Sequence, residues 1–181
     1  IQHVFQRVPC SSLVSQGSDR VDFFCEKVLP RILRNEQKHT LVFIPSYFDF
    51  VMLRNLLLEK EVSFCSVTEY SSTSEVSRGR ARFLQGRKPL LLYTGRAHYF
   101  LRHAIKGIRH LIFLGLPEHA SFYSAHVNAI NQGLGEDADS SNLASCLALF
   151  TKYEGHALER IVGQENFRRM QGDKSSFIFT T

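Results

Sequence analysis

The chain has 181 residues, with 22 Lys and Arg against 17 Asp and Glu, so its formal net charge is +5. This length suits one domain of ordinary size, and the 44% hydrophobic and 12% aromatic residues exclude a disordered chain. The longest apolar runs, such as residues 41–44 and 89–93, are too short to cross a bilayer. Because the first residue is Ile1 rather than Met, we expect a partner domain outside this sequence.

Short β-rich runs alternate with segments of helical spacing along the chain. Several of these runs are almost continuously apolar, which is typical of strands that are covered on both faces. The predicted strands are Val4–Val8, Leu41–Ile44, Ser63–Val67, Leu90–Tyr93, Leu111–Leu114 and Phe177–Phe179. Such an alternation predicts an α/β sandwich with a mostly parallel sheet and right-handed crossovers.

Two helices are predicted between the first three strands. The first has apolar residues at helical spacing over Val21–Ile32, and Pro30 should kink it or separate two helices. The second opens at Ser46–Asp49, where a Ser followed three positions later by an acidic residue has the pattern of a capping box. Asp49 is therefore interpreted as a helix-capping carboxylate.

A third helix and a loop complete the pattern. The sequence Ser72–Glu75 also has the pattern of a capping box, and Gly86 is expected to end the helix that starts there. The turn-rich stretch Asn131–Asn142 predicts an exposed loop. With no internal repeat and no long linker, residues 1–181 are predicted to form a single domain.

The basic residues gather in one part of the chain. From Val76 to Pro117 there are nine Lys and Arg and no Asp or Glu, whereas the remainder has 13 Lys and Arg against 17 Asp and Glu. The nine are Arg78, Arg80, Arg82, Arg87, Lys88, Arg96, Arg102, Lys106 and Arg109. Ligands of open α/β sheets bind at the carboxyl ends of strands, and this block contains two strand ends. Its charge favours the phosphates of a nucleic acid, with a solvated face or a dock for an acidic protein as alternatives.

The third helix carries three of these arginines. Arg78 and Arg82 are four residues apart and share one face. Arg80 falls among the apolar positions of the opposite side. Three arrangements are open for it: its stem extends past the edge of the core, its guanidinium binds a buried carboxylate such as Glu69, or it contacts a phosphate directly.

Sequence signatures of common catalytic sites are absent. There is no G-x-x-x-x-G-K-[ST], G-x-G-x-x-G, G-x-S-x-G or H-E-x-x-H. His98 and His103 follow a strand without a carboxylate nearby in sequence. The four cysteines form no C-x-x-C pair, so reduced thiols are expected rather than a zinc site. We therefore assign no catalytic residue, no metal and no cofactor.

Six stretches of the sequence form a recognisable series. They are Phe43–Phe50, Glu69–Gly86, Leu91–Phe100, Ile105–Pro117, Phe122–Asn128 and Lys152–Val162. In this order they resemble the second RecA-like lobe of superfamily-two RNA helicases, and most closely the digestive organ expansion factor family, the helicase-like U-three small nucleolar RNA-associated proteins of the small-subunit processome. The resemblance implies a RecA-like three-layer sandwich, with a first RecA-like lobe and an acidic N-terminal region outside this chain.

The resemblance also implies a setting and partners. Members of this family act in the nucleus, in the nucleolus, in the maturation of small-subunit ribosomal RNA. Expected partners are the ribosomal RNA precursor, a small nucleolar ribonucleoprotein, processome assembly proteins and the chain's own first lobe, with no membrane. Together with the basic block, this predicts RNA binding by Ser46, Tyr47, Arg78, Arg80, Arg82, Thr94, Arg96, His98, Arg102 and Lys106.

The residues at the end of one predicted strand differ from those of active helicases, and this difference argues against catalysis. Thr94 matches the Thr that begins a helicase motif there. The next position is often acidic in such proteins, but here it is Gly95. That difference weakens any role linked to ATP.

The expected arginine finger is also missing. Tyr123 aligns with the approach to the finger motif, yet residues 118–151 include no Lys or Arg, and neither His126 nor Asn128 supplies a fixed positive charge. Such fingers accelerate related NTPases by about 10³–10⁵-fold. The leading hypothesis is thus a catalytically inactive helicase lobe used as an RNA- and protein-binding scaffold. The alternatives are an active ATP-dependent RNA helicase lobe separated from its first lobe, and a pure protein-docking module.

Overall fold

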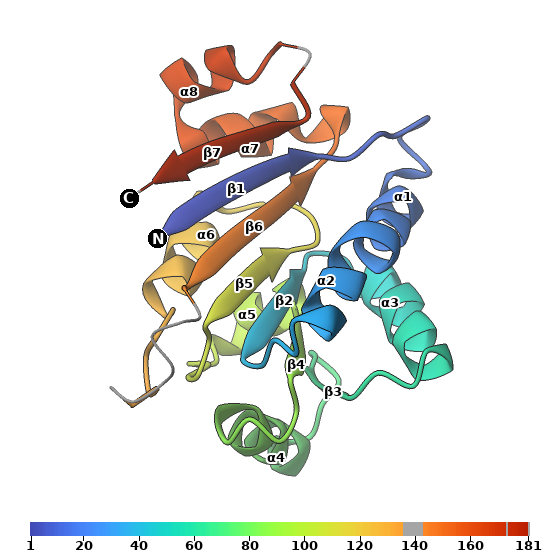
Figure 1. Ribbon diagram of the computed structural model, residues 1–181, viewed down its shortest axis with the longest axis vertical. Helices are drawn as coiled ribbons and strands as arrows, with labels where there is room; N and C mark the ends of the chain where they lie inside the picture. The colour runs from blue at the N-terminus through green and yellow to red at the C-terminus, as the bar shows by residue number, and fades with distance from the viewer. Residues whose placement is uncertain (136–142, 173, 181) are drawn as a thin grey trace.

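The computed structural model describes residues 1–135, 143–172 and 174–180. Its strands are β1 (Gln2–Arg7), β2 (Thr40–Ile44), β3 (Phe64–Val67), β4 (Leu90–Thr94), β5 (His110–Phe113), β6 (Ser145–Phe150) and β7 (Ser176–Thr180). Within the described residues they form one seven-stranded sheet in the order β3-β4-β2-β5-β6-β1-β7 (Figure 1). All neighbouring strands are parallel except β7, which runs antiparallel to β1.

Helices cover both faces of this sheet. They are α1 (Gln16–Phe23), the π-helical turn η1 (Phe24–Val28), α2 (Leu29–Arg34), α3 (Tyr47–Glu59), α4 (Thr73–Leu84), α5 (Gly95–Leu101), α6 (Ala120–Asn128), the 3₁₀ turn η2 (Lys152–Glu154), α7 (Gly155–Val162) and α8 (Gln164–Arg169). One core lies under α1 to α3 and a second under α4 to α8. The predicted three-layer α/β sandwich with a mostly parallel sheet is confirmed.

The central strand β2 is completely buried. Its residue Phe43 lies opposite Tyr93 of β4 and Phe113 of β5 in the parallel register. Because both faces of the sheet are covered, all five residues of β2 are apolar or buried, as the continuous apolar run predicted. Parallel strands end at one edge, so the turns after β2, β4, β5 and β6 lie together there.

Each predicted strand is present, but one strand was missed. The run at 145–150, β6, separates β5 from β1 and pairs in parallel with both. Its sequence mixes Ser, Cys and Ala with Leu and Phe, and such residues suit a short helix as well as a strand. Its strand conformation is determined by pairing with β1 and β5, which are distant from it in sequence.

The predicted helix starts had different outcomes. Pro30 does mark a junction, since it lies at the start of α2 directly after η1. The capping box at the start of α4 is confirmed: Ser72 N donates to Glu75 Oε2 at 2.7 Å and Glu75 N donates to Ser72 Oγ at 3.2 Å. Gly86, with φ of +69°, follows that helix as expected. At α3, however, Ser46 is the N-cap without any side-chain capping bond, so the capping box predicted there is wrong.

The two ends of the chain meet in the sheet. The strand β1 lies between β6 and β7, and Gln2 is opposite Thr180. Arg7 fastens this region, because its guanidinium donates to the carbonyl oxygens of Met170 at 2.6 Å and Gly172 at 3.0 Å. Of the predicted exposed loop Asn131–Asn142, residues 136–142 lie outside the described residues. None of the helices described has the length and apolar character that spanning a membrane requires.

Candidate functional site

A groove runs along the exposed side of α4, next to β3 and the first turns of α3. We call it the α4 groove, and its volume is about 400 Å³. Its aromatic and charged lining residues are Tyr47, Phe50, Arg54, Phe64, Tyr70, Glu75, Arg78, Arg82 and Lys88. Among these described residues there are four cationic side chains and one carboxylate, so the groove has a net positive charge.

The α4 groove joins cations to aromatic rings. Arg78 and Arg82 are exposed on one face of α4, as predicted. The ring centroids of Tyr47 and Tyr70 are 4.9 Å apart in an edge-to-face contact, and the Arg54 guanidinium carbon lies 5.8 Å from the centroid of Phe50. Aromatic faces beside fixed cations suit the bases and phosphates of a single strand.

Arg54 and Tyr70 are among the groove residues that the sequence analysis missed. Both lie outside the basic block, which drew attention to residues 76–117. A signal for Arg54 was present, because Tyr47, Phe50 and Arg54 are spaced by three and four residues and so share a face of α3. No comparable signal existed for Tyr70, which the turn after β3 brings to the groove.

The carboxylate in the groove belongs to the helix cap. Glu75 accepts a hydrogen bond from the backbone N–H of Ser72, and hydrogen bonding from Ser72 lowers the pKa of Glu75. Its charge stabilises the N-terminus of α4. The exposed arginines of the same helix therefore keep their charge available to a ligand.

Arg80 and Lys106 line a separate hollow of about 290 Å³ beside Ser77, Ala81 and Leu84. The Arg80 guanidinium donates to the carbonyl oxygen of Ala104 at 2.6 Å. Of the three arrangements left open for Arg80, the pairing with Glu69 is absent, and Glu69 accepts its hydrogen bond from Thr94. Arg80 thus helps to hold the segment after α5 in place.

Thr94 is not exposed as an RNA-binding residue should be, and this part of the prediction is corrected. The residue is 1% exposed, and its hydroxyl donates to Glu69 Oε2 at 2.8 Å while accepting from Ala97 N at 3.4 Å. Since α5 begins directly after β4, the strand-end threonine becomes the N-cap of that helix. Ser46, the N-cap of α3, is half-buried.

His98 is likewise buried, which corrects its assignment to an RNA surface. Its Nδ1 lies 3.1 Å from the Tyr93 hydroxyl, and its ring centroid is 4.5 Å from that of His126. Burial, and then the nearby His126, Arg102 and His103, lowers the pKa of His98 to about 4. The imidazole is therefore neutral at neutral pH and cannot attract a phosphate.

The last two predicted cations lie at the two ends of α5. Arg96 is exposed in its first turn, with the guanidinium carbon 5.6 Å from the ring centroid of Phe100. Arg102 ends the helix in a left-handed conformation, with φ of +45°, and its guanidinium carbon lies 4.6 Å from the ring centroid of Phe122. The ten predicted residues are thus divided among the α4 groove, the Arg80 hollow, the ends of α5 and the buried interior.

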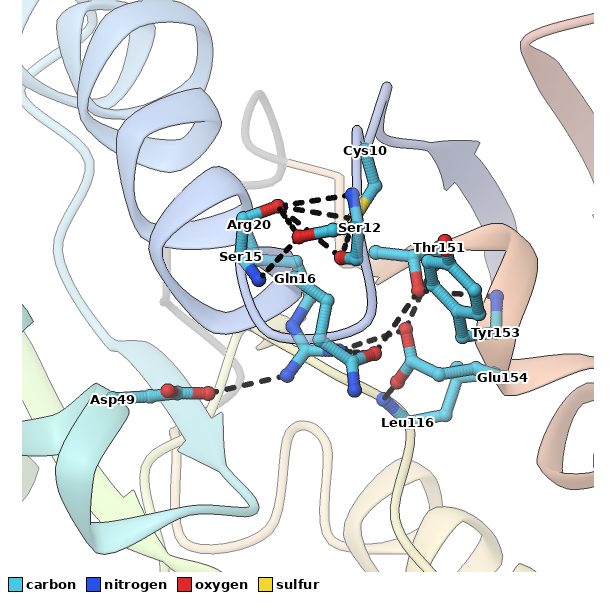
Figure 2. A network of polar contacts seen from close by, with 10 residues as sticks. All are labelled: Cys10, Ser12, Ser15, Gln16, Arg20, Asp49, Leu116, Thr151, Tyr153 and Glu154. Atoms are coloured by element: carbon cyan, nitrogen blue, oxygen red, sulfur yellow. Dashed lines mark hydrogen bonds and ion pairs between the residues drawn. The ribbon is translucent and has the colours of Figure 1, made fainter.

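A buried ionic network lies at the carboxyl ends of the parallel strands, which we call the strand-end edge. Figure 2 shows this network from close by. Arg20 of α1 contacts two carboxylates: its Nη2 is 3.2 Å from Asp49 Oδ2, and its Nη1 is 2.9 Å from Glu154 Oε2. All three side chains are largely buried. The prediction that Asp49 caps α3 is therefore wrong, because its carboxylate pairs with an arginine from another helix.

The network also binds backbone at two strand ends. Glu154 Oε1 accepts from Leu116 N, after β5, at 3.0 Å, and Glu154 Oε2 accepts from Thr151 N, after β6, at 2.7 Å. Thr151 Oγ1 donates in turn to Gln16 Oε1 of α1 at 3.2 Å (Figure 2). One guanidinium and two carboxylates thereby join α1, α3 and the ends of two strands.

Two glycines make room for this network. A Cβ at Gly115 would lie 3.0 Å from the Arg20 guanidinium carbon. A Cβ at Gly17 would collide with the Asp49 carboxylate. Gly95, which follows β4, has a similar constraint, because its Cβ would lie 3.2 Å from the carbonyl oxygen of Pro45. An acidic side chain at position 95 would therefore require the turn after β2 to move.

The residues near the expected arginine finger have structural roles. The Tyr123 hydroxyl lies 2.8 Å from His3 Nδ1, and its ring stacks on Phe113 with centroids 4.7 Å apart. His126 is buried, its Nδ1 is 2.6 Å from the carbonyl oxygen of Phe122, and burial lowers its pKa. Asn128 is exposed at the C-terminal end of α6.

The sheet order and the helices on both faces are those of a RecA-like helicase domain. The solved structure of Mss116p DEAD-box helicase domain 2 bound to an RNA duplex is similar with a TM-score of 0.63 and 14% identity, over 91% of this chain and 59% of that one. The E. coli DEAD-box protein SrmB, bound to regulator of ribonuclease activity A, has a TM-score of 0.60 and 15% identity over 88% and 82%. At such identities the likeness shows the fold.

Within that class the family is shown by sequence. The chain belongs to the Utp25 C-terminal domain family, whose model matches residues 1–179. It is 42% identical over 183 residues to the U3 small nucleolar RNA-associated protein 25 homolog of Homo sapiens, covering 100% of this chain and 24% of that protein. Protein NUCLEOLAR FACTOR 1 of Arabidopsis thaliana is 34% identical over 180 residues, 99% of this chain and 23% of that protein.

The chain therefore spans about a quarter of the length of the curated relatives it matches. The resemblance drawn from the six sequence stretches is confirmed for a family of U3 small nucleolar RNA-associated relatives and for the helicase-like fold.

Proposed function

We propose that this chain is a catalytically inactive helicase-like lobe that binds RNA and assembly proteins in small-subunit ribosome biogenesis in the nucleolus. The names of the relatives support this setting, since they are U3 small nucleolar RNA-associated proteins and a nucleolar factor. The ligands we propose are the ribosomal RNA precursor with its small nucleolar ribonucleoprotein, processome assembly proteins and a first lobe outside this chain. The observation that carries RNA binding is the α4 groove with its exposed Arg78 and Arg82.

The absence of catalysis is supported by the charges at the strand-end edge. Phosphoryl transfer needs a cation that is free to stabilise the charge developing on the transferred group. Arg20 is buried there between two carboxylates, so its charge is already compensated. Residues 118–151 include no Lys or Arg, and an acidic side chain at position 95 would require the turn after β2 to move.

Reversal of two charges tests RNA binding. The variant Arg78→Glu/Arg82→Glu should fold normally, because both side chains are exposed, and should bind single-stranded RNA more weakly. The slope of log Kd against log salt should fall by about 1.4, since each lost phosphate contact on a single strand removes about 0.7. Titrations by fluorescence anisotropy at several salt concentrations measure both quantities.

A matched control carries the same change of charge at the opposite end of the sheet. Arg168→Glu/Arg169→Glu alters two exposed residues of α8, beyond β7 and far from α4 (Figure 1). This variant should keep the wild-type salt slope. An equal loss in both variants would mean that net charge alone attracts RNA. Unchanged affinity in the α4 variant would exclude the groove as the binding site.

Hydrolysis measurements test catalytic inactivity. The full-length protein should show no ATP hydrolysis above background, with or without single-stranded RNA, because residues 118–151, where the arginine finger is expected, include no Lys or Arg. A coupled phosphate-release assay with an active helicase as positive control is sufficient. RNA-stimulated turnover would instead support the active helicase, and inactivity without RNA affinity would support a protein-docking module.

A further inference from the structure

A second hollow lies at the strand-end edge, where β2, β4 and β5 end. We call it the strand-end pocket; it is about 370 Å³ in volume and lies between α5 and the start of α6. Its floor is apolar and includes Phe43 and Phe122, which are buried. Gly95 adds no side chain to the lining. This pocket contains one residue of the predicted RNA surface, Arg96, and is otherwise unassigned.

Flat aromatic rings form one side of the pocket's rim. Tyr99 and Phe100 are 52% and 60% exposed. The rings of Tyr99 and His119 are nearly parallel, with an interplanar angle of 21° and centroids 6.0 Å apart. Exposed aromatic groups around an apolar floor favour a ligand with a flat ring.

Charges of opposite sign complete the rim. Arg96 and Glu118 both line the pocket and are both exposed. A nucleotide matches this pair, because its phosphate is an anion and its base carries hydrogen-bond donors. Guanine presents a ring N–H and an exocyclic amine side by side, so one carboxylate can accept from both. Uracil has a single N–H flanked by two carbonyl oxygens, which a carboxylate repels.

The strand-end pocket and the α4 groove are lined by neighbouring residues of one stretch of chain. Pro45 lines the pocket and Tyr47 lines the groove, so one residue, Ser46, separates the two linings. Because residues two apart lie within about 7 Å, the two linings approach each other at Ser46, and an RNA strand that lies against α4 and passes this point can place a base in the pocket. This proximity favours a residue of an RNA chain over a free nucleotide.

We propose that the strand-end pocket receives one unpaired guanine of a bound RNA strand. The base stacks on Tyr99 and His119, its donor edge faces Glu118, and Arg96 meets the adjoining phosphate. The proposal rests on RNA binding by the α4 groove and adds a base preference to it. Stacking on aromatic side chains tolerates any base, so the preference for guanine comes from Glu118.

Binding of matched RNAs tests this preference. Oligouridine with one central guanosine should bind about tenfold more tightly than oligouridine alone, the discrimination expected of a bidentate contact with a base. Replacing that guanosine by inosine, which lacks the exocyclic amine, should remove most of the gain. Fluorescence anisotropy at fixed salt gives each Kd.

Variants assign the effect to the pocket. Glu118→Gln should bring the two RNAs close to equal affinity, because the neutral amide no longer accepts from both donors of guanine and no longer repels the carbonyl oxygens of uracil. Tyr99→Ala should weaken binding of the guanosine-containing RNA about tenfold through lost stacking. Glu59→Gln and Tyr153→Ala are the controls, because both residues are exposed and line neither hollow. Neither control should alter the preference.

Several results would overturn the proposal. Equal affinity for the two RNAs, or a guanosine preference that survives Glu118→Gln, would remove the base contact while leaving the α4 groove intact. Complete competition by guanosine monophosphate near the Kd of the RNA would assign the pocket to a free nucleotide. Conversely, a guanosine preference that persists in Arg78→Glu/Arg82→Glu while the affinity for both RNAs stays at the wild-type value would support the pocket and count against the groove.

Discussion

Replacing Arg20 by Ala should lower the free energy of unfolding by about 3–5 kcal/mol. The change leaves Asp49 and Glu154 largely buried without their counter-charge, and removal of one partner of a buried ionic group is costly because the remaining charge is uncompensated. The network in Figure 2 also loses its link between α1 and the strand ends. Urea unfolding followed by circular dichroism measures the change.

Two further variants make this expectation specific. Asp49→Asn introduced together with Arg20→Ala should recover part of the lost stability, because it removes one of the unpaired charges. Arg169→Ala breaks the ion pair between Arg169 and Glu165, whose side chains are 69% and 84% exposed, and should change stability by at most about 0.5 kcal/mol. Similar effects of Arg20→Ala and Arg169→Ala would show that the buried network contributes little.

Phe43→Ala should be comparably severe, at about 3–5 kcal/mol. Phe43 is 1% exposed in the central strand, and its ring centroid lies 4.9 Å from that of His126 and 5.5 Å from that of Phe113. Truncation removes contacts with neighbours on three other elements and leaves a cavity that a central strand cannot collapse to fill. The midpoint of urea unfolding should fall while the denaturant slope stays constant.

A second phenylalanine five positions later serves as the matched control. Phe48 is 81% exposed on the first turn of α3, so Phe48→Ala should be nearly neutral. A near-neutral Phe43→Ala variant would contradict the central, buried position of β2. Because Phe43 also lies in the floor of the strand-end pocket, Phe43→Leu is the better choice where binding is to be measured.

The architecture could be predicted because it depends on patterns that are local in sequence. Apolar runs such as Leu41–Ile44 indicate strands that are covered on both faces. The capping box at Ser72 and Glu75 indicates a helix start, because its two hydrogen-bonded residues are only three positions apart. The strand β6 was missed although residues 146–150 form an apolar run, because Leu and Ala suit a buried helix as well as a strand. Its place between β5 and β1 is decided by contacts across the whole chain.

The site was predictable only where exposure follows from helical spacing. Arg78 and Arg82 are exposed because they occupy the polar face of an amphipathic helix, and that face can be read from the sequence. Thr94 and His98 were misassigned because a strand end indicates an edge of the sheet but not whether a side chain there is buried. Asp49 matched a capping pattern, yet it is paired with an arginine 29 positions earlier, which no local rule indicates.

The pairing of β1 has a consequence for the order in which the domain can assemble during its synthesis. Within this domain β1 is made before the other strands, but both of its neighbours in the sheet, β6 and β7, are made after them. Until then β1 has two open edges and an uncovered Phe5, and pairings of such long sequence separation form slowly. The edges of β1 therefore stay open to pairing with other strands until residues 145–180 have been made.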